Sequence, residues 1–365
     1  MVNIVFRVDS SVQIGTGHLM RCLTLADVLR AKKTTVSFIC RELPGNLCDF
    51  IERKGFGTYR LPFITAHDDN QNPGYTQWLG VGWKEDAEQI KAILVKEDKA
   101  IDWLIIDHYA LDRQWETMLR PYVKKMMVID DLANRNHNCD LLLDQNLYEN
   151  METRYKGLVP EHCQILLGPK YALLRSEFRE ERRNLRQRDG NVQRILIFFG
   201  GSDPTNETSK ALEALRLLNR PDIAVDVVIG ASNTHANEVE ALASNIPDTI
   251  CHFHVENMAE LMALADLSIG AGGTATWERC CVGLPSLVIT IAENQRDIAE
   301  NLAQNGSIIN LGWYESIKES DINSTLENFL ANPDRIRQMS LKGMQLVDAD
   351  GTNKVAETVE EISTK

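Results

Sequence analysis

Residues 7–22, RVDSSVQIGTGHLMRC, indicate the fold class because they join an apolar strand pattern to an amphipathic helix pattern. Residues 2–8 are typical of a strand buried on both faces, and the residues after 18 carry leucines at helical spacing. Gly15 and Gly17 lie between the two patterns, where glycine lets the backbone approach a ligand and the first N–H groups of a helix remain free. This order predicts a phosphate or sugar site at Gly15 and Gly17.

The same loop departs from the pattern that binds dinucleotides. That pattern needs a third glycine three residues after the second and an acidic residue about 20 residues further on. Met20 stands where the third glycine is required. The sequence therefore disfavours a nicotinamide cofactor, and we expect no cofactor.

His18 follows the loop directly and falls in the first turn of the predicted helix. The positive end of a helix dipole disfavours an imidazolium ion, so we expect the neutral imidazole, which is able to take a proton from water. The residues alone leave a second interpretation open, in which His18 only caps or packs the helix.

Short apolar runs alternate with helical patterns in both halves of the chain, as expected for parallel sheets with helices on both faces. In order, the predicted strands are residues 2–8, 36–40, 103–107, 126–130, 141–143 and 165–167, then 195–199, 224–229, 249–254, 267–269, 286–291 and 307–311.

We therefore predict an α/β fold of two Rossmann-like, doubly wound domains that face a cleft. The first domain spans residues 1–175, a charged linker spans 176–193, and the second domain spans 194–365 with two closing helices at 333–347 and 352–363. Ligands of such folds bind at loops that follow the carboxyl ends of strands, so both halves are expected to supply the site.

Two more glycine loops, at residues 199–204 and 270–276, follow predicted strands in the second half and suit a pyrophosphate. The loop at residues 199–204 is alternatively a plain turn from strand to helix. Glu278 can accept hydrogen bonds from a cis-diol such as ribose, or it only stabilises the dipole of its helix. Asn294 can contact phosphate or an acetamido group, or it is a helix N-cap. The candidate ligand contacts of this half are Gly201, Ser202, Gly273, Thr274, Glu278, Asn294 and Gln295.

The composition limits the classes of partner that the protein is expected to bind. A formal net charge of −13 repels nucleic acid and anionic membranes, so any phosphate must be held locally. No apolar run approaches the ~20 residues that span a bilayer, and the amino-terminal sequence lacks the features of a signal peptide. The eight cysteines show no CxxC pair, so we expect reduced thiols and a cytoplasmic protein, with its oligomeric state open.

Several motifs, in order along the chain, resemble one family of enzymes. They are RVDSS with IGTGHLMRCLTLA, IDHY (106–109), IDDLANR (129–135), CDLLLDQN (139–146), LLGPKYALLRSEF (166–178), FFGGSDPTN (198–206), GAGGTATWERCCVGLP (270–285) and ENQ (293–295). The family is the UDP-2,4-diacetamido-2,4,6-trideoxy-β-L-altropyranose hydrolases of pseudaminic-acid synthesis. This resemblance implies a glycosyltransferase-B-like fold and metal-independent release of UDP with inversion at the anomeric carbon.

The resemblance also assigns roles to residues. It makes His18 the catalytic base, Tyr109 a catalytic residue of the cleft and Glu278 the ligand of the uridine ribose. Asn294, with Gln295 beside it, is placed near the sugar and phosphates, and Arg175 is a further substrate contact. Asp107, Asp130 and Asp131 lie at strand ends and could hold Mg²⁺ or orient His18; the resemblance favours a supporting role over a metal site.

The sequence thus predicts an enzyme that splits a UDP-sugar with water, and three alternatives remain. A glycosyltransferase would use a sugar hydroxyl in place of water, and a hydrolysing UDP-sugar 2-epimerase would change the configuration at C2. A nucleotide-sugar-binding protein without catalysis is the third, because a fold alone does not separate these functions.

Overall fold

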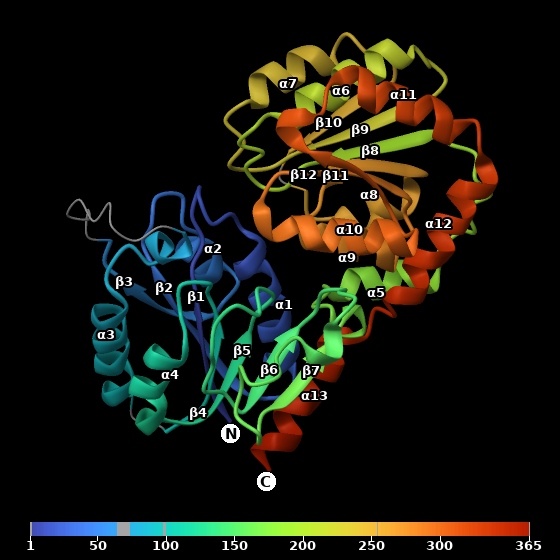
Figure 1. Ribbon diagram of the computed structural model, residues 1–365. Coiled ribbons are helices and arrows are strands. Elements are labelled where there is room, and N and C mark those ends of the chain that lie inside the picture. Colours follow the sequence, from blue (N-terminus) through green and yellow to red (C-terminus); the bar gives the residue numbers. More distant parts are fainter. Residues whose placement is uncertain (1, 64–73, 98–99, 254, 365) are drawn as a thin grey trace. The chain divides into compact units, whose positions relative to one another are not determined.

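The computed structural model describes residues 2–63, 74–97, 100–253 and 255–364 (Figure 1). The chain forms two compact units. The first contains Met1–Asn146, Asn150–Leu173 and Gly351–Lys365, and the second contains Leu147–Glu149 and Leu174–Asp350. Within the described ranges, every helix is too short or too polar to span a membrane.

The first unit is built on a seven-stranded sheet in the order β3-β2-β1-β4-β5-β6-β7, with every neighbouring pair parallel. Its strands are β1 Asn3–Val8, β2 Thr35–Arg41, β3 Gly57–Leu61, β4 Ile101–Asp107, β5 Val123–Ile129, β6 Leu141–Asp144 and β7 Gln164–Leu167. Its α-helices are α1 Gly17–Ala31, α2 Cys48–Arg53, α3 Trp83–Lys96, α4 Arg113–Leu119 and α13 Gly351–Ser363.

Strand β1 is central and fully buried, and its side chains alternate between two cores. Ile4, Phe6 and Val8 join the core on the side of α1 and α13, whereas Val5 joins the core on the side of α3 and α4. This alternation follows from the two-residue period of a strand. Because the chain leaves β1 toward β2 on one side and β4 lies on the other, the strand order reverses between β1 and β4.

The second unit repeats the plan with six parallel strands in the order β10-β9-β8-β11-β12-β13. They are β8 Arg194–Phe198, β9 Ala224–Ile229, β10 Thr249–Phe253, β11 Leu267–Ala271, β12 Ser286–Thr290 and β13 Ile309–Trp313. The α-helices are α5 Ser176–Arg183, α6 Glu207–Leu218, α7 Ala236–Ala243, α8 Met258–Leu264, α9 Ala275–Cys281, α10 Arg296–Asn305, α11 Glu319–Leu330 and α12 Pro333–Leu346. Here the order reverses between β8 and β11.

All twelve predicted strands are present within a few residues, and His254, at the end of the predicted strand 249–254, lies outside the described residues. The prediction missed β3. This strand lies at the edge of its sheet, and only Leu61 of its five residues is buried, so its sequence, GTYRL, lacks an apolar run.

The structure departs from the predicted domain boundaries in two places. Helix α13 was assigned to the second domain but packs against α1 in the first unit, where Val355, Ala356 and Val359 are buried. The predicted linker 176–193 belongs to the second unit. It contains α5 and Arg188, whose buried guanidinium donates to the carbonyl oxygens of Val282 at 2.5 Å and Met262 at 2.9 Å. A segment rich in arginine is typical of a solvent-exposed linker. Here its arginine side chains donate hydrogen bonds to carbonyl groups next to helix ends.

Truncating a buried side chain of α13 will test this docking. Val355 is 0% exposed, so Val355→Ala should lower the free energy of unfolding by about 2 kcal/mol through lost burial and a residual cavity. Denaturation in urea measures the change, with exposed Glu357→Ala on the same helix as the control, which should change by less than ~0.5 kcal/mol. Equal stability of the two variants would contradict the docking of α13.

Candidate active site

The candidate active site of the first unit lies where the strand order reverses. Val8 at the end of β1 pairs with Asp107 at the end of β4, so the loop after β1 and the end of β4 lie side by side. In open α/β sheets, ligands bind at such a reversal, outside the carboxyl ends of the strands.

The loop after β1 turns tightly before the helix begins. The Gly15 N–H donates to the Ser11 carbonyl at 2.9 Å, and the Ile14 N–H donates to Ser11 Oγ at 2.9 Å. Gly15 has φ +78°, a conformation that glycine adopts without strain. Thr16 precedes α1 without capping it through its side chain, which leaves the amides at the start of α1 available to a ligand. Gly15 and Gly17 thus occupy the predicted loop and helix start, and ligand binding there stays a prediction.

His18, the second residue of α1, is held by Asp107. His18 Nδ1 lies 2.7 Å from Asp107 Oδ1, and the side chains are 11% and 0% exposed. A carboxylate accepts hydrogen bonds only, so this contact assigns the proton of the neutral ring to Nδ1 and leaves Nε2 as the acceptor. Asp107 therefore lies where it can orient the His18 ring, as its position at a strand end suggested.

Arg21 completes this arrangement and was missed by the sequence analysis. Its Nε lies 2.6 Å from Asp107 Oδ2 and its Nη2 lies 2.7 Å from Asp107 Oδ1, a bidentate pair with both side chains almost fully buried. Burial alone would raise the pKa of Asp107, but the charges and hydrogen bonds of Arg21 and His18 outweigh it and hold the pKa well below its usual range. The available signal was the placement of an arginine three residues after His18, on the same helix face.

Tyr109 lies against His18 and is fixed by a second carboxylate. The two rings meet edge to face, with centroids 4.6 Å apart at 87°. The Tyr109 hydroxyl donates to Asp131, which also accepts from Arg21 Nη1 and from Asn146 Nδ2, both at 3.2 Å. Burial, and then the charge of Asp131, raises the pKa of Tyr109 well above its usual range, so the hydroxyl stays protonated. The structure therefore brings His18 and Tyr109 together through Arg21.

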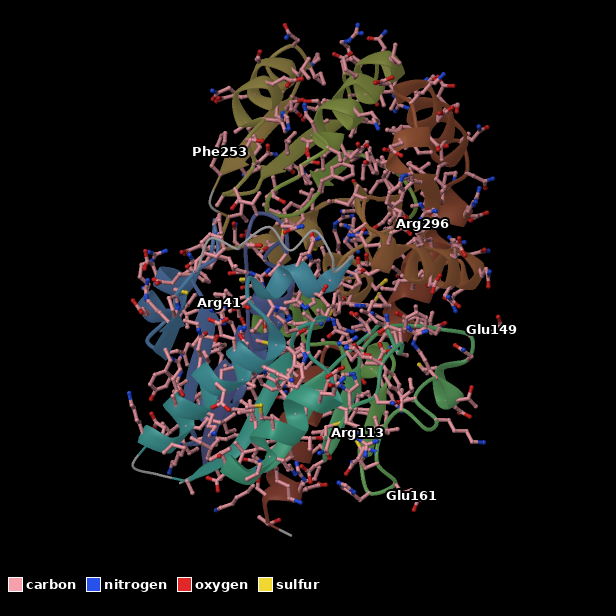
Figure 2. All side chains as sticks on the ribbon, turned by 60° about the vertical axis from the view of Figure 1, so that its left-hand side comes forward. Arg41, Arg113, Glu149, Glu161, Phe253 and Arg296 are labelled. Atoms are coloured by element: carbon pink, nitrogen blue, oxygen red, sulfur yellow. The ribbon has the colours of Figure 1, made fainter. Side chains whose placement is uncertain are left out.

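A network of buried ion pairs holds Asp9, the first residue of the loop after β1. Arg7, inside β1, pairs with Asp9 at 2.6 Å and with Asp86 of α3 at 2.8 Å. Arg41, at the end of β2 (Figure 2), pairs with Asp86 at 2.7 Å and donates its backbone N–H to Asp9 at 2.6 Å. His108 Nε2 lies 3.4 Å from Asp9, and burial lowers the pKa of His108. Each charge thus has an opposite partner, as buried ions require.

The carboxylates of Asp107, Asp130 and Asp131 form ion pairs with arginine side chains and do not form a cluster of their own. Asp130 pairs with Arg135 at 2.8 Å and accepts from Tyr155, while Asp107 and Asp131 share Arg21. In the part of the chain that the structure describes, no group of three or more histidine, cysteine or acidic side chains is arranged to hold a metal ion.

The second unit places its two glycine loops on neighbouring strands. Phe198 at the end of β8 pairs with Gly270 of β11, so Gly201 and Ser202 follow one strand and Gly273 and Thr274 follow the next. The loop after β8 is fixed by Asp203, whose carboxylate accepts from the N–H groups of Glu207 and Thr208 at the start of α6.

Gln295 joins the second glycine loop to the end of β12. Its Oε1 accepts from the Ile291 N–H at 3.2 Å, and a Cβ added at Gly272 would lie 3.4 Å from the Gln295 Cβ. Part of the role of Gln295 is therefore structural. Asn294 lies within a short 3-10 turn, Glu293–Gln295, and the N-cap of α10 is Gln295, so the N-cap alternative for Asn294 is not what the structure shows.

Glu278 and Arg175 form an ion pair with each other. Arg175 Nη2 lies 3.2 Å from Glu278 Oε1, and Arg175 Nη1 lies 3.0 Å from Glu177. Glu278 is 19% exposed at its side chain and lies in the first turn of α9, so its role toward a ribose and its role at the helix dipole both stay predictions. The structure brings together two residues that were predicted separately, and their contacts with substrate stay predictions.

Comparison with known proteins bears on the fold and the family. Residues 195–358 match the family model of the glycosyltransferase family 28 C-terminal domain. A UDP-2,4-diacetamido-2,4,6-trideoxy-β-L-altropyranose hydrolase of Campylobacter jejuni is 29% identical over 84% of this chain and 97% of its own. The resemblance that the motifs indicated is therefore confirmed.

Other relatives carry broader names. A spore coat polysaccharide biosynthesis protein of Bacillus subtilis is 27% identical over 97% of this chain and 96% of its own. An uncharacterized protein of Methanocaldococcus jannaschii is 28% identical over 79% of this chain, and that match spans 56% of its length.

Solved structures confirm the fold. Acinetobacter baumannii MurG matches with a TM-score of 0.66 at 14% identity, over 99% of this chain and 100% of that one. Phytolacca americana UGT2 matches with a TM-score of 0.68 at 13% identity, over the full length of both. The two parallel-sheet units thus form a glycosyltransferase-B-like α/β fold.

Removing Arg21 will test its hold on Asp107. Arg21→Met leaves a buried carboxylate without its main partner, so the free energy of unfolding at pH 7 should fall by about 3–5 kcal/mol. The double variant Arg21→Met with Asp107→Asn should recover part of this loss, because Asp107 then carries no charge and, of the two carboxylates, only Asp131 still loses the charge of Arg21. Urea denaturation measures both. Arg30→Met, on the same helix with a 43% exposed side chain, is the control; an equal loss in Arg30→Met and Arg21→Met would contradict the assignment.

Asp144 gives the first unit a pH-dependent stability. Burial, and then the charge of Asp131, raises the pKa of Asp144 to about 7. A carboxyl whose folded pKa lies above its unfolded value of ~3.9 contributes stability that is present at low pH and lost as the pH rises through about 7.

Asp144→Asn should therefore remove a decrease in unfolding free energy, on the order of a few kcal/mol, between pH 5 and pH 8. The Asn146 N–H donates to Asp144 Oδ1 at 3.0 Å, a contact that the amide oxygen of asparagine keeps. Urea denaturation across this range measures the effect, and Asp334→Asn, 76% exposed, is the control. A pH dependence that persists in Asp144→Asn would count against this origin.

Proposed function

We propose that this protein hydrolyses a UDP-linked 2,4-diacetamido-2,4,6-trideoxy-L-altrose to the free sugar and UDP, with inversion at C1, in pseudaminic-acid biosynthesis. The observation that carries the proposal is the His18–Asp107 pair, 2.7 Å apart, at the start of a helix that follows a glycine loop. It supplies a base whose Nδ1 is occupied and whose Nε2 is the remaining acceptor. The choice of this sugar rests on the motif resemblance and on the hydrolase of Campylobacter jejuni to which the chain is similar.

In the proposed reaction, His18 Nε2 accepts a proton from water while the water oxygen bonds to C1. The bond between C1 and the β-phosphate oxygen breaks, and UDP leaves with the bonding electrons. Asp107 stabilises the imidazolium that forms, and Arg21 holds the carboxylate in place. Tyr109, tied to Asp131, orients the water or the sugar beside the imidazole ring. Fixing water and sugar in one geometry supplies a large part of the rate.

The second unit is proposed to bind the nucleotide. Backbone amides of the loops that contain Gly201, Ser202, Gly273 and Thr274 would take the pyrophosphate, with Asn294 and Gln295 beside it, and Glu278 would accept from the ribose hydroxyls. Local amides and hydroxyl acceptors suit a chain with a net charge of −13, which offers no broad basic surface for phosphate. Arg175 would keep the Glu278 carboxylate oriented.

A glycosyltransferase is the second candidate, and the family 28 C-terminal domain at residues 195–358 favours it. Both functions use a base in the position of His18, and they differ in the acceptor. An added sugar or lipid-linked hydroxyl would be required for turnover by a transferase, whereas the hydrolase needs water alone.

Oxygen-18 water separates these mechanisms. The purified protein and the UDP-sugar are incubated in labelled water with a chelator present, and the products are followed by NMR and mass spectrometry. We expect the label in the free sugar and an inverted anomer. Label in UDP would mean attack at phosphorus and would reject the mechanism, and a requirement for an added acceptor would support the transferase.

His18→Ala should lower kcat by about 10²–10⁴-fold, the usual contribution of a general base, while inhibition by UDP stays within twofold of the wild type. His162→Ala is the matched control, because His162 is 60% exposed at its side chain and lies in the same unit. Steady-state kinetics measure both variants. A parallel loss of UDP affinity and turnover in His18→Ala would make His18 a structural residue.

A further inference from the structure

A group of aromatic rings surrounds His18, and the proposed reaction does not use all of them. Residues Tyr75–Leu79 form a 3-10 turn, η1, that brings Tyr75 and Trp78 to the base. The Trp78 ring lies 6.0 Å from the His18 ring at 78°, and it stacks on Tyr109 at 5.4 Å and 24°. Tyr75 meets both Trp78 and Tyr109, at 4.7 and 4.8 Å.

This turn is anchored by one residue and leaves its large rings at the surface of the unit. Leu79 is 2% exposed and joins the core on the side of α3 and α4. Tyr75 and Trp78 are only half-buried, although rings of this size gain most by complete burial. Both rings therefore keep part of their surface open to a ligand.

The indole N–H of Trp78 is also available. Trp103, Trp115 and Trp313 each donate their N–H to a side-chain oxygen, at 2.7, 2.9 and 3.1 Å. Trp78 has no such partner within the described ranges. An aromatic face beside a spare donor suits a ligand that combines C–H surface with a carbonyl oxygen.

From these contacts we infer that Trp78, with Tyr75, forms a subsite that selects a 6-deoxy, N-acylated pyranose. The subsite deepens the proposed function and rests on it. The ring faces cover the methyl group and the C–H face of the sugar, and the indole N–H donates to an acetamido carbonyl. A hexose with a hydroxymethyl group at C5 would place a hydroxyl against the rings, where it loses its hydrogen bonds to water.

Three variants test the subsite. Trp78→Ala removes both the ring and the N–H, and Trp78→Phe keeps a ring without the donor. Trp83→Ala is the matched control, because Trp83 begins α3 five residues later, is half-buried and takes no part in the ring contacts with His18. For each, kcat and KM are measured with UDP-2,4-diacetamido-2,4,6-trideoxy-β-L-altrose. Inhibition constants are measured for UDP and for the free 2,4-diacetamido-2,4,6-trideoxy sugar.

We expect Trp78→Ala to weaken inhibition by the free sugar, and to raise KM, by about tenfold or more, with inhibition by UDP within twofold of the wild type. Trp78→Phe should fall between Trp78→Ala and the wild type, and Trp83→Ala should match the wild type. An unchanged UDP constant shows that the loss is confined to binding of the sugar.

Two results would overturn the inference, and they are distinguishable. An active wild type whose Trp78→Ala and Trp78→Phe variants keep its KM and its free-sugar inhibition rejects the subsite alone. A wild type that releases no UDP from the diacetamido substrate rejects the proposed function, and the subsite falls with it.

Discussion

The ion pair between Arg21 and Asp107 holds the candidate site of the first unit together. It joins the first helix to the end of β4 through two short hydrogen bonds, and it does so where almost no water reaches. The same guanidinium reaches Asp131, so one cation fixes the carboxylates behind both His18 and Tyr109. Breaking this pair would leave the buried carboxylates of Asp107 and Asp131 without the charge of Arg21. Because that state is high in free energy, the three side chains are held in one arrangement.

The fixed position of Asp107 also affects the chemistry available to His18. A carboxylate that is fully bound by arginine stays ionised, so it does not compete with His18 for the proton of a water molecule. It orients the ring and opposes the charge that the ring acquires. The guanidinium of Arg21 also lies 3.2 Å from His18 Nδ1, so the same cation contacts both the carboxylate and the ring that the carboxylate orients.

Much of the fold was predictable because its strands are continuous apolar runs and its loops carry glycine at strand ends. The reversal between β1 and β4 puts His18, at the start of the helix that follows β1, beside Tyr109, which follows β4, and both residues were predicted. Arg21, by contrast, looks like an ordinary polar position on a helix, and only its tertiary partners reveal it. Edge strand β3 and the aromatic turn around Trp78 were missed for related reasons, since neither has a periodic apolar pattern. The closing helix was misassigned because an amphipathic pattern records that a face is buried, not which sheet buries it.

That closing helix has a consequence for how the protein is made. The first unit is discontinuous: Met1–Asn146 and Asn150–Leu173 precede the second unit, and Gly351–Lys365 follows it. On the ribosome, the core beside α1 stays open until the residues of α13 have been synthesised, long after its sheet has emerged. The second unit, apart from the short segment Leu147–Glu149, is contiguous and is able to fold earlier. The unit whose synthesis begins first is therefore the last to complete its fold. While the second unit is being translated, the apolar surface that α13 will cover remains exposed on the first unit.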